Sequence, residues 1–373
     1  MLNREELREI AEIHGNGNYF VSMYLNVNPV TNPKGDYVIH FKNMLRGISD
    51  GVEKKILKKI TADIEKMEAF IVNNKRGFRK GLAILSSAEG AFWKDYNLAV
   101  PVKNGIIVDR TPYIEPLLDI INNYQRYAVV LVDKESARLF LVQLGEIVEY
   151  GEVHTADIPG KHKKGGWFAL SQNHYERHID YHVGLHLKDV IKKLETFLKA
   201  EKIENVVLGG SPEAVSMFRE MIQKTVADKL IGAFSSEMIA KNNEVLQKAM
   251  PVIAGYEKEK EKTSVSELMT GAMKGGNAVI GMENVLSALQ EGRVMRLLFV
   301  KDFKESGFAC KNCRYITKQK VSACPYCNNA IEQINYLVDL TAQKAVEHGA
   351  IVEVVSENKE LSKAGNIGAF LRF

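Results

Sequence analysis

The chain has 373 residues, of which 46% are hydrophobic and 26% are charged, and its formal net charge is +4. This length exceeds what one hydrophobic core usually serves, so we expect two or three folded domains. The composition excludes a disordered chain, and no apolar run approaches the roughly 20 residues of a membrane-spanning helix. The opening stretch MLNREELREI lacks the apolar core of a signal peptide. We therefore expect a cytoplasmic protein without a membrane partner.

The first 124 residues are predicted to form an α+β domain. The stretch NREELREIAEI has a helical pattern, and YFVSMYLNV carries the β-branched and aromatic residues typical of a strand. A long helix is expected near residues 52–74, where apolar side chains recur at helical spacing. The recurring side chains are Ile56, Ile60, Ile64 and Met67. Three strand-like runs follow, GLAILSS, AFWKDYNLAVPV and NGIIVDR.

Residues 125–262 are predicted to form a second domain. It begins with the buried-strand pattern YAVVLVD and the hairpin pattern ARLFLVQLGEIVEYGEV, and a helix is expected from about residue 170 to 199. In ENVVLGGSPEAVSMFREMI, a strand and a glycine turn lead to a helix, with Ser211 and Pro212 suited to its N-cap and first position. The next helix is expected to end in the charged run YEKEKEKTS, which we interpret as a domain boundary.

Residues 263–373 are predicted to form an α/β sandwich, interrupted by a small insertion at residues 308–332. Strands are expected at NAVIG, RLLFV, AIVEVVS and IGAFLRF, and helices at MENVLSALQEG and YLVDLTAQKAVEHG. The expected fold class of the whole chain is therefore a mixture of α/β and α+β.

All four cysteines lie in this insertion, as CKNC and CPYC with ten residues between them. Each CxxC pair puts two thiolates on one turn, and two pairs close a tetrahedral site around Zn²⁺ at about 2.3 Å per bond. The predicted ligands are Cys310, Cys313, Cys324 and Cys327. Four thiolates leave no open coordination position, so the zinc is expected to be structural. The alternatives are a redox dithiol, which usually stands alone before a helix, or free buried thiols.

Six of the nine histidines fall between residues 154 and 186, and four of them repeat at every fourth position. These four are His174, His178, His182 and His186. Positions i and i+4 share a helix face, so neighbouring pairs have the spacing to chelate a metal. The stripe drifts by about 40° per step, however, so four ligands would not converge on one ion. We interpret the stripe as a solvated or RNA-facing helix surface.

The loop GKHKKGGW, residues 160–167, is the candidate RNA-binding site. Its two glycines permit positive φ and close approach of another backbone, and its three lysines supply positive charge for phosphates. The predicted contact residues are Lys161, His162, Lys163, Lys164, Gly165, Gly166 and Trp167. The alternative is a surface turn whose tryptophan packs onto its own domain.

Several stretches resemble the class-1 peptide chain release factors of archaea and eukaryotes. PGKHKKGGWFAL resembles the family's PxKHGRGGQSAL, and YAVVLVDKESARLFLVQLGEIVEY resembles the start of its middle domain. NAVIGMENVLSALQEGRVMRLLFV and GAIVEVVSENKELSKAGNIGAFLRF resemble the start and the end of its third domain, where archaeal members also carry CxxC pairs. The resemblance implies a three-domain release-factor-like architecture with a zinc-ribbon insertion in the third domain.

The chain departs from this family at the residues that carry its chemistry. Release factors have a glutamine after the two glycines, and this chain has Trp167, whose indole has one N–H donor and no acceptor. Ser171 and His174 stand where the family has arginines. The first segment contains no NIKS sequence, no tyrosine–cysteine–phenylalanine motif and no cysteine at all. We therefore expect residues 1–124 to be a degenerate decoding domain.

The resemblance implies a ribosome-binding translation factor. Such a factor would occupy the aminoacyl-tRNA site and approach ribosomal RNA at the peptidyl-transferase centre, without stop-codon decoding or efficient peptide release. The hibernation factor Balon and the Pelota rescue proteins of this wider family behave in this way, and family members are delivered by a translational GTPase of the EF-Tu type.

No catalytic residue is assigned, and two alternatives stay open. One is a peptidyl-tRNA hydrolase acting on stalled ribosomes, since the backbone N–H after the second glycine is available whatever the side chain. The other is a module that binds a non-ribosomal RNA or a protein.

Overall fold

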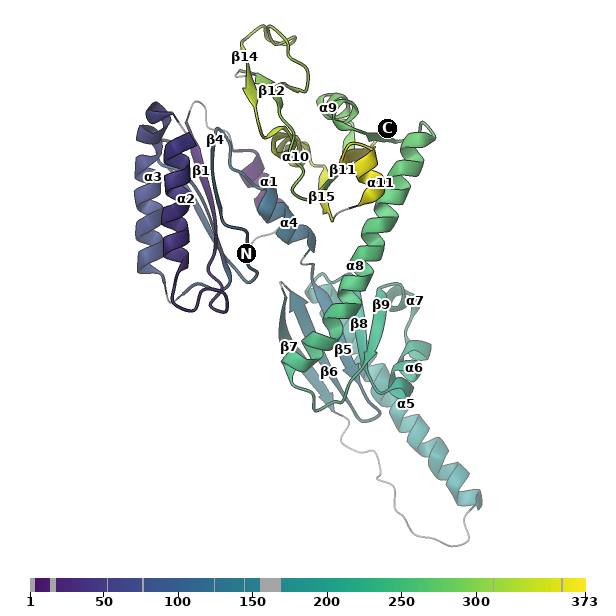
Figure 1. Cartoon of the computed structure of the whole chain (residues 1–373). Helices are drawn as coiled ribbons and strands as arrows, with labels where there is room; N and C mark the ends of the chain where they lie inside the picture. Colours follow the sequence, from purple (N-terminus) through teal and green to yellow (C-terminus); the bar gives the residue numbers. More distant parts are fainter. Residues whose placement is uncertain are drawn as a thin grey trace. The chain divides into compact units, whose positions relative to one another are not determined.

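The computed structural model describes residues 4–373 except 14–17, 52, 76, 124, 144, 155–168, 311 and 357. The chain divides into two compact units: unit 1 comprises residues 1–123 and 261–373, and unit 2 comprises residues 124–260. Helices pack on sheets in both units, which confirms the mixed α/β class (Figure 1). The division into domains at residues 1–124, 125–262 and 263–373 stays a prediction.

The first sheet of unit 1 comes from the N-terminal third of the chain. Its strands are β1 (Phe20–Asn26), β2 (Gly81–Ser87), β3 (Phe92–Leu98) and β4 (Gly105–Asp109), and its helices are α2 (Tyr37–Gly51) and α3 (Lys54–Asn73). All pairings are antiparallel, in the order β3-β2-β1-β4. The two central strands are almost wholly buried because α2 and α3 pack their apolar sides on them, side by side on one face (Figure 1). The α2 helix was missed in the sequence.

The second sheet of unit 1 is mixed, with order β10-β16-β11-β15. Its strands are β10 (Ala278–Ile280), β11 (Val294–Val300), β15 (Ile351–Val355) and β16 (Ile367–Leu371), and its helices are α9 (Met282–Gln290), α10 (Leu337–Glu347) and α11 (Lys359–Lys363). Only the β11–β15 pairing among these is parallel. Four predicted strands and two predicted helices are confirmed here, whereas the short α11 was not foreseen.

Two helices from the N-terminal third pack within this second part of unit 1. They are α1 (Arg4–Ala11) and α4 (Glu115–Asn123). The amide Nε2 of Gln343 on α10 donates to the carbonyl of Ala11 at 2.9 Å, and Lys301 pairs with Asp119 of α4 at 2.8 Å. These contacts join segments that are far apart in the sequence.

The cysteine insertion forms a small antiparallel sheet of its own, in the order β13-β12-β14. Its strands are β12 (Gly307–Cys310), β13 (Ile316–Thr317) and β14 (Ile331–Ile334). At Gly307 a side-chain Cβ would lie 2.7 Å from the carbonyl oxygen of Thr317 and from a methyl of Leu337. Glycine is therefore required where the base of the insertion meets α10.

Unit 2 is a five-stranded mixed sheet, in the order β7-β6-β5-β8-β9, with helices on both faces. Its strands are β5 (Tyr127–Val132), β6 (Ser136–Gln143), β7 (Glu146–His154), β8 (Asn205–Gly210) and β9 (Leu230–Ser235), and its helices are α5 (Ala169–Ala200), α6 (Pro212–Met221), α7 (Lys224–Ala227) and the first part of α8 (Asn242–Met273). Successive side chains of β5 alternate between the face covered by α5 and α6 and the face covered by α8. All six residues of β5 are therefore buried.

The expected end of α8 was wrong. The helix does not stop in the charged run at residues 256–264 but continues to Met273. Lysine and glutamate are good helix formers, so the run propagates the helix rather than breaking it. The carboxylates of Glu257 and Glu261 are also occupied, by the Tyr127 hydroxyl in unit 2 and the Ser356 backbone N–H in unit 1. Among the described helices, α8 included, none has the length and apolar character needed to cross a membrane.

Candidate functional site

The loop predicted to bind RNA lies outside the described residues, together with all seven of its candidate contact residues. They are Lys161, His162, Lys163, Lys164, Gly165, Gly166 and Trp167. The structure does describe the two elements that bracket the loop. Strand β7 ends at His154, and helix α5 begins at Ala169. The geometry of these two elements fixes where the loop starts and where it ends.

Helix α5 is anchored by its C-terminal half. The predicted helix at 170–199 is confirmed, and its core residues follow a strict helical spacing: Val183, Leu187, Val190, Leu194 and Phe197. From Ala169 to Val183 a helix rises about 21 Å, at 1.5 Å per residue. Figure 1 shows this N-terminal part of α5 extending beyond the sheet of unit 2. The first turns of α5 are therefore held away from the body of the unit.

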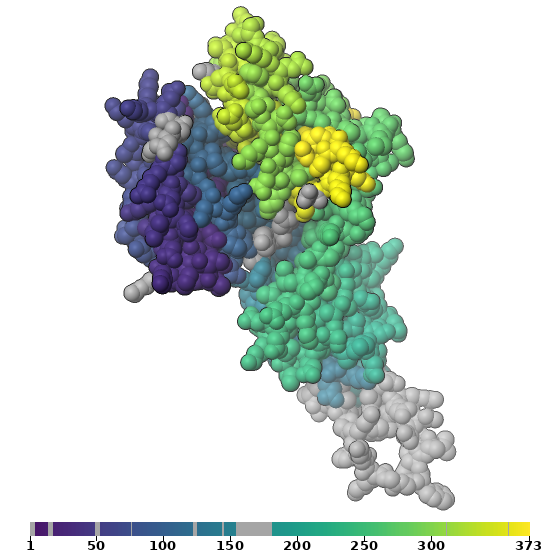
Figure 2. All heavy atoms as spheres, viewed as in Figure 1, coloured from purple at the N-terminus to yellow at the C-terminus, as the bar shows by residue number. Residues whose placement is uncertain are grey.

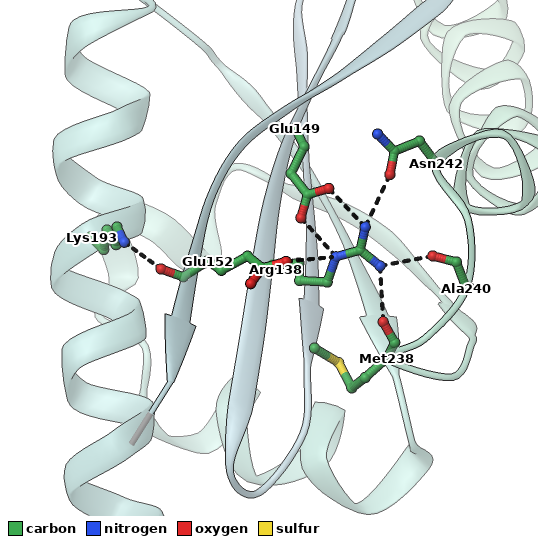
Figure 3. A network of polar contacts seen from close by, with 7 residues as sticks. All are labelled: Arg138, Glu149, Glu152, Lys193, Met238, Ala240 and Asn242. Atoms are coloured by element: carbon green, nitrogen blue, oxygen red, sulfur yellow. Dashed lines mark hydrogen bonds and ion pairs between the residues drawn. The ribbon is translucent and has the colours of Figure 1, made fainter. Parts of the chain in front are cut away.

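The strand on the other side of the loop is fixed by Arg138 of β6 (Figure 3). Its guanidinium meets Glu149 of β7 through two parallel hydrogen bonds, Nε to Oε1 at 2.7 Å and Nη2 to Oε2 at 2.8 Å. It also donates to the carbonyls of Met238 and Ala240 and to Oδ1 of Asn242, at 2.9, 2.7 and 3.0 Å. All five N–H donors of the arginine are thereby used.

The Arg138 network is mostly shielded from water, since the arginine side chain is 14% exposed and that of Glu149 25%. The hydrogen bonds from Arg138 lower the pKa of Glu149, so the pair stays ionised at neutral pH. Bidentate, charge-assisted bonds of this kind are among the stronger polar contacts in proteins. The network fastens the β6–β7 hairpin to the segment that leads into α8.

Two contacts tie β7 to α5 directly. Lys193 of α5 donates from Nζ to the backbone carbonyl of Glu152 at 2.6 Å (Figure 3). The rings of Tyr150 and Phe197 are stacked, with centroids 4.1 Å apart and an interplanar angle of 28°. Strand β7 and the C-terminal half of α5 are therefore locked to each other.

The histidine stripe is only partly described. The side chains of His174 and His178 lie outside the described set, His182 is half-buried with its ring edge-on to Tyr181, and His186 is fully buried. The prediction of a solvated stripe is therefore wrong at His186. The reason is its position one turn from Val183 and from Val190, on the side of α5 that faces the sheet.

The four cysteines predicted to bind zinc converge. The sulfur atoms of Cys310, Cys313, Cys324 and Cys327 all lie within 4.8 Å of one another. Two of the separations are 3.4 Å, from Cys310 to Cys327, and 3.3 Å, from Cys313 to Cys324. Four thiolates around one Zn²⁺ at about 2.3 Å would be about 3.8 Å apart, so the cluster has the size of a tetrahedral metal site.

The two CxxC turns are built in the same way. The N–H of Cys310 donates to the carbonyl of Tyr315 at 2.8 Å, and that of Cys324 donates to the carbonyl of Asn329 at 3.0 Å. In both turns the residue after the second cysteine, Arg314 or Asn328, has a positive φ, 60° or 57°, and donates back to the carbonyl of the first cysteine. Two matching turns present their sulfurs to a common point.

Backbone and side-chain N–H groups point at the sulfurs of this cluster. The N–H of Asn312 donates to Sγ of Cys310 at 3.4 Å, and Nδ2 of Asn329 to Sγ of Cys327 at 3.5 Å. Hydrogen bonds from the backbone and side chain of Asn329 lower the pKa of the Cys327 thiol to about 5. Donors of this kind stabilise thiolate, the form that binds metal. The residues present therefore fit a bound metal ion.

A second group of titratable residues was not foreseen in the sequence. The hydroxyl of Tyr336 donates to Oδ1 of Asp109 at 2.7 Å, and Tyr113 donates to Glu115 close by. Burial raises the pKa of Asp109 to about 6. Burial, and then the neighbouring Glu115, raise the pKa of Asp339 to about 8. No local motif connects these residues, which only the packing of unit 1 brings together.

Comparisons with known proteins connect these features to a family. The sequence model of bacterial archaeo-eukaryotic release factor family 10 matches residues 112–254. Peptide chain release factor subunit 1 of Methanocaldococcus jannaschii is 26% identical over 419 aligned positions, which cover 100% of this chain and 97% of the relative. Peptide chain release factor subunit 1 of Archaeoglobus fulgidus is 23% identical, and the match covers 99% of this chain and 96% of the relative.

Solved structures of related description are also similar. The crystal structure of the archaeal translation termination factor aRF1 is 15% identical, with a TM-score of 0.28, and the match covers 100% of this chain and 99% of that one. The structure of ribosome-bound archaeal Pelota and ABCE1 contains a chain that is 13% identical, with a TM-score of 0.44, and the match covers 100% of this chain and 94% of that one.

The family match over unit 2 and the full-length relatives define a release-factor-like protein. The match to residues 112–254 and the full-length relatives support the resemblance to class-1 release factors that the sequence motifs predicted.

Proposed function

We propose that this protein is a translation factor that binds the ribosome at the aminoacyl-tRNA site, where it neither reads stop codons nor releases peptide efficiently. The proposal rests on one substitution in a chain that is similar to release factors over its full length. The chain aligns with archaeal release factor subunit 1 from end to end, yet Trp167 follows the glycine pair. A role in hibernation or in rescue of stalled ribosomes follows from binding without release.

The surroundings of the loop support this proposal. A basic loop with two glycines is connected to the end of a helix whose first turns extend beyond its own unit. Such a helix can carry a positively charged loop into a recess of a large RNA particle, where phosphates attract the lysines. The locked β7–α5 pair gives the loop a rigid base, which lowers the entropy lost on binding.

We further propose that the four-cysteine site holds Zn²⁺, and that a GTPase of the EF-Tu type delivers the protein. A Cys₄ site in two CxxC turns is the usual structural zinc arrangement, and it leaves no coordination position for catalysis. When bound, the ion would supply folding free energy to an insertion that is too small to have a core of its own. The first domain would serve in positioning rather than in decoding.

Two measurements on the purified protein test the proposed function. Co-sedimentation with ribosomes at about 100 mM salt should show binding, and a stalled ribosome carrying labelled peptidyl-tRNA should retain its peptide. Rapid peptide release would instead support a peptidyl-tRNA hydrolase. Absence of ribosome binding, with a folded protein, would favour a module for another RNA or for a protein.

A further inference from the structure

We propose that the outer end of the cysteine insertion is a second RNA-binding surface, which binds a single-stranded segment by stacking a base on Tyr326. This surface belongs to unit 1 and is separate from the loop at residues 160–167. Binding at this surface does not require the ribosome, so it can be tested independently of the function proposed above.

The first observation is an aromatic side chain with little cover. Tyr326 lies inside the second CxxC turn, between Cys324 and Cys327, and is 71% exposed. Its ring contacts that of Tyr315, which follows the first CxxC turn, with centroids 5.1 Å apart and planes inclined by 52°. The cysteine turns thus hold two tyrosines against each other, and the outer one keeps most of its surface open to solvent.

The second observation is the charge of the insertion. Residues 306–331 contain four basic residues and neither aspartate nor glutamate. The basic residues are Lys311, Arg314, Lys318 and Lys320. A zinc ion with four thiolates carries a formal charge of −2, which leaves +2 on the segment. The acidic partners of this region lie at its base, where Lys318 meets Glu305 at 3.1 Å and Arg314 meets Glu347 at 2.9 Å. The two remaining cations, Lys311 and Lys320, balance the formal charge of the zinc site, so the outer part is formally neutral and contains no acidic side chain.

The third observation is a set of exposed amide side chains on the same insertion. Asn312 and Asn328 belong to the two CxxC turns, and Gln319 stands next to Lys320 in the connection between them. Primary amides both donate and accept, as the edges of unpaired bases do. Stacking rings, amides and cations together are the means by which proteins bind single-stranded RNA. An acidic peptide would use the cations but would gain little from an open tyrosine face.

The base of the insertion is rigid, so the surface is formed before any RNA arrives. Gln290 of α9 donates to the carbonyl of Ile316 at 2.7 Å, and Lys344 of α10 donates to the carbonyl of Arg314 at 2.9 Å. Beyond these contacts the turns project from the helices of unit 1, as the yellow-green protrusion in Figure 2 shows. A preformed, projecting surface loses little conformational entropy on binding.

The test measures binding of a fluorescein-labelled oligouridylate 12-mer to the full-length, zinc-loaded protein by fluorescence anisotropy. The three lysines of the 160–167 loop are changed to alanine in every sample, so that the insertion dominates the signal. In this background Tyr326→Ala should weaken binding about 5- to 150-fold, the equivalent of about 1–3 kcal/mol. Tyr326→Phe, which keeps the ring, should bind nearly as well as the unchanged tyrosine.

The cations give a separate readout. Changing Lys320 to alanine should lower the slope of log affinity against log salt by up to about 0.7, the value for one phosphate contact on a single strand. Tyr181→Ala is the matched control, because Tyr181 is also highly exposed, at 64%, but lies on α5 in unit 2. Zinc content and unfolding midpoint are measured for each variant, and both should stay unchanged in Tyr326→Ala.

Three results would overturn the proposal. One is no binding of the oligouridylate by the background protein, and another is equal affinity before and after Tyr326→Ala. The third is binding of a glutamate 12-mer that is as tight as binding of the oligouridylate and that Tyr326→Ala weakens by the same factor. That result would identify an acidic protein partner. The two proposals can be separated. If the oligouridylate binds as expected but the wild-type protein does not sediment with ribosomes, the proposed function is refuted and the RNA-binding surface is supported.

Discussion

Arg138 and Glu149 form a bidentate ion pair across the β6–β7 hairpin, with N···O distances of 2.7 and 2.8 Å and the arginine only 14% exposed. Because β7 leads directly to the loop at residues 155–168, this pair fixes one of the two points from which the loop departs. The contribution of this pair to the free energy of unfolding can be measured.

Arg138→Ala should destabilise unit 2 by about 3 kcal/mol, since it leaves the shielded Glu149 carboxylate and two backbone carbonyls without their donor. Arg138→Lys keeps the charge but loses the planar fork, so it should recover only part of this loss. Urea unfolding measures both. Lys134→Ala is the control, because its pair with Glu213 is exposed and should contribute less than about 1 kcal/mol. Equal effects of Arg138→Ala and Lys134→Ala would contradict the assigned role.

The metal site gives a prediction of stoichiometry. The purified, reduced protein should contain about one equivalent of zinc, and Cys324→Ser should lose it. Because a site of this kind folds with its metal, a chelator should unfold residues 306–334 while leaving unit 2 intact. Metal analysis and proteolysis before and after chelation measure these effects. A folded sample without metal, and with all four thiols reactive, would refute the prediction.

The carboxyl group of Asp339 predicts a pH dependence. Its pKa rises from 3.8 to about 8 on folding, mainly through burial and secondly through Glu115, with Asp109 acting in the same direction and Lys304 opposing. The folded state therefore holds a proton that the unfolded state has lost between about pH 4 and pH 8. Linkage then requires stability to be greatest below this window and to fall as the pH rises through it.

The test of this dependence is Asp339→Asn, which keeps a donor toward Glu115 but cannot ionise. The melting temperature of this variant should fall less between about pH 5 and pH 9 than that of the wild type. Asp302→Asn is the matched control, since Asp302 is exposed and pairs with Lys103 at 3.3 Å. A wild type whose stability rises over this range would have the opposite sign and would exclude a neutral Asp339.

Much of the fold was readable because its signals are local. Strand β5 is six consecutive apolar residues, as expected of a strand covered on both faces, and Ser211 accepts from the N–H of Ala214 as the predicted N-cap. The cysteine cluster was also readable, because the CxxC spacing itself defines two equivalent turns. In each case, neighbouring residues carry all the information.

The features that were missed depend on partners far away in the sequence. Helix α2 begins with YVIHF, which reads as a strand, and it is helical because its apolar side packs on β1 and β4. The contact between Arg138 and Glu149 depends on the register of a hairpin that shifts between Leu139 and Phe140. The burial of His186 needs the orientation of α5 on the sheet, and histidine spacing alone does not contain it.

The basic loop should contribute to ribosome binding through phosphate neutralisation. Changing Lys161, Lys163 and Lys164 together to alanine should weaken co-sedimentation and lower the salt slope by about 2–3. A matched control comes from α5, where Lys188, Lys192 and Lys199 are exposed and lie on its anchored half. If both triple variants lose binding equally, the effect is one of net charge. If neither does, the loop makes no contact, and affinity resides elsewhere.

The side chain at position 167 is expected to determine whether the loop binds RNA or promotes hydrolysis of peptidyl-tRNA. We predict that the wild-type protein leaves peptidyl-tRNA intact and that Trp167→Ala weakens ribosome binding about 5- to 150-fold, the equivalent of about 1–3 kcal/mol from one lost stacking contact. Trp167→Gln restores the Gly-Gly-Gln sequence of release factors and should permit slow hydrolysis. This hydrolysis should not depend on a stop codon, because residues 1–124 lack the decoding motifs.

The competing interpretation is that Trp167 packs onto its own domain, and it makes a different prediction for the same variant. Trp167→Ala would then lower the free energy of unfolding by about 3–5 kcal/mol, as truncation of a core aromatic does, and would affect binding only through the unfolded fraction. Trp93→Ala supplies the comparison, because Trp93 packs against the core of unit 1. Measuring ribosome affinity and urea unfolding on both variants separates the two outcomes. Loss of affinity at unchanged stability supports the binding role, and fast peptide release by the wild-type protein refutes it.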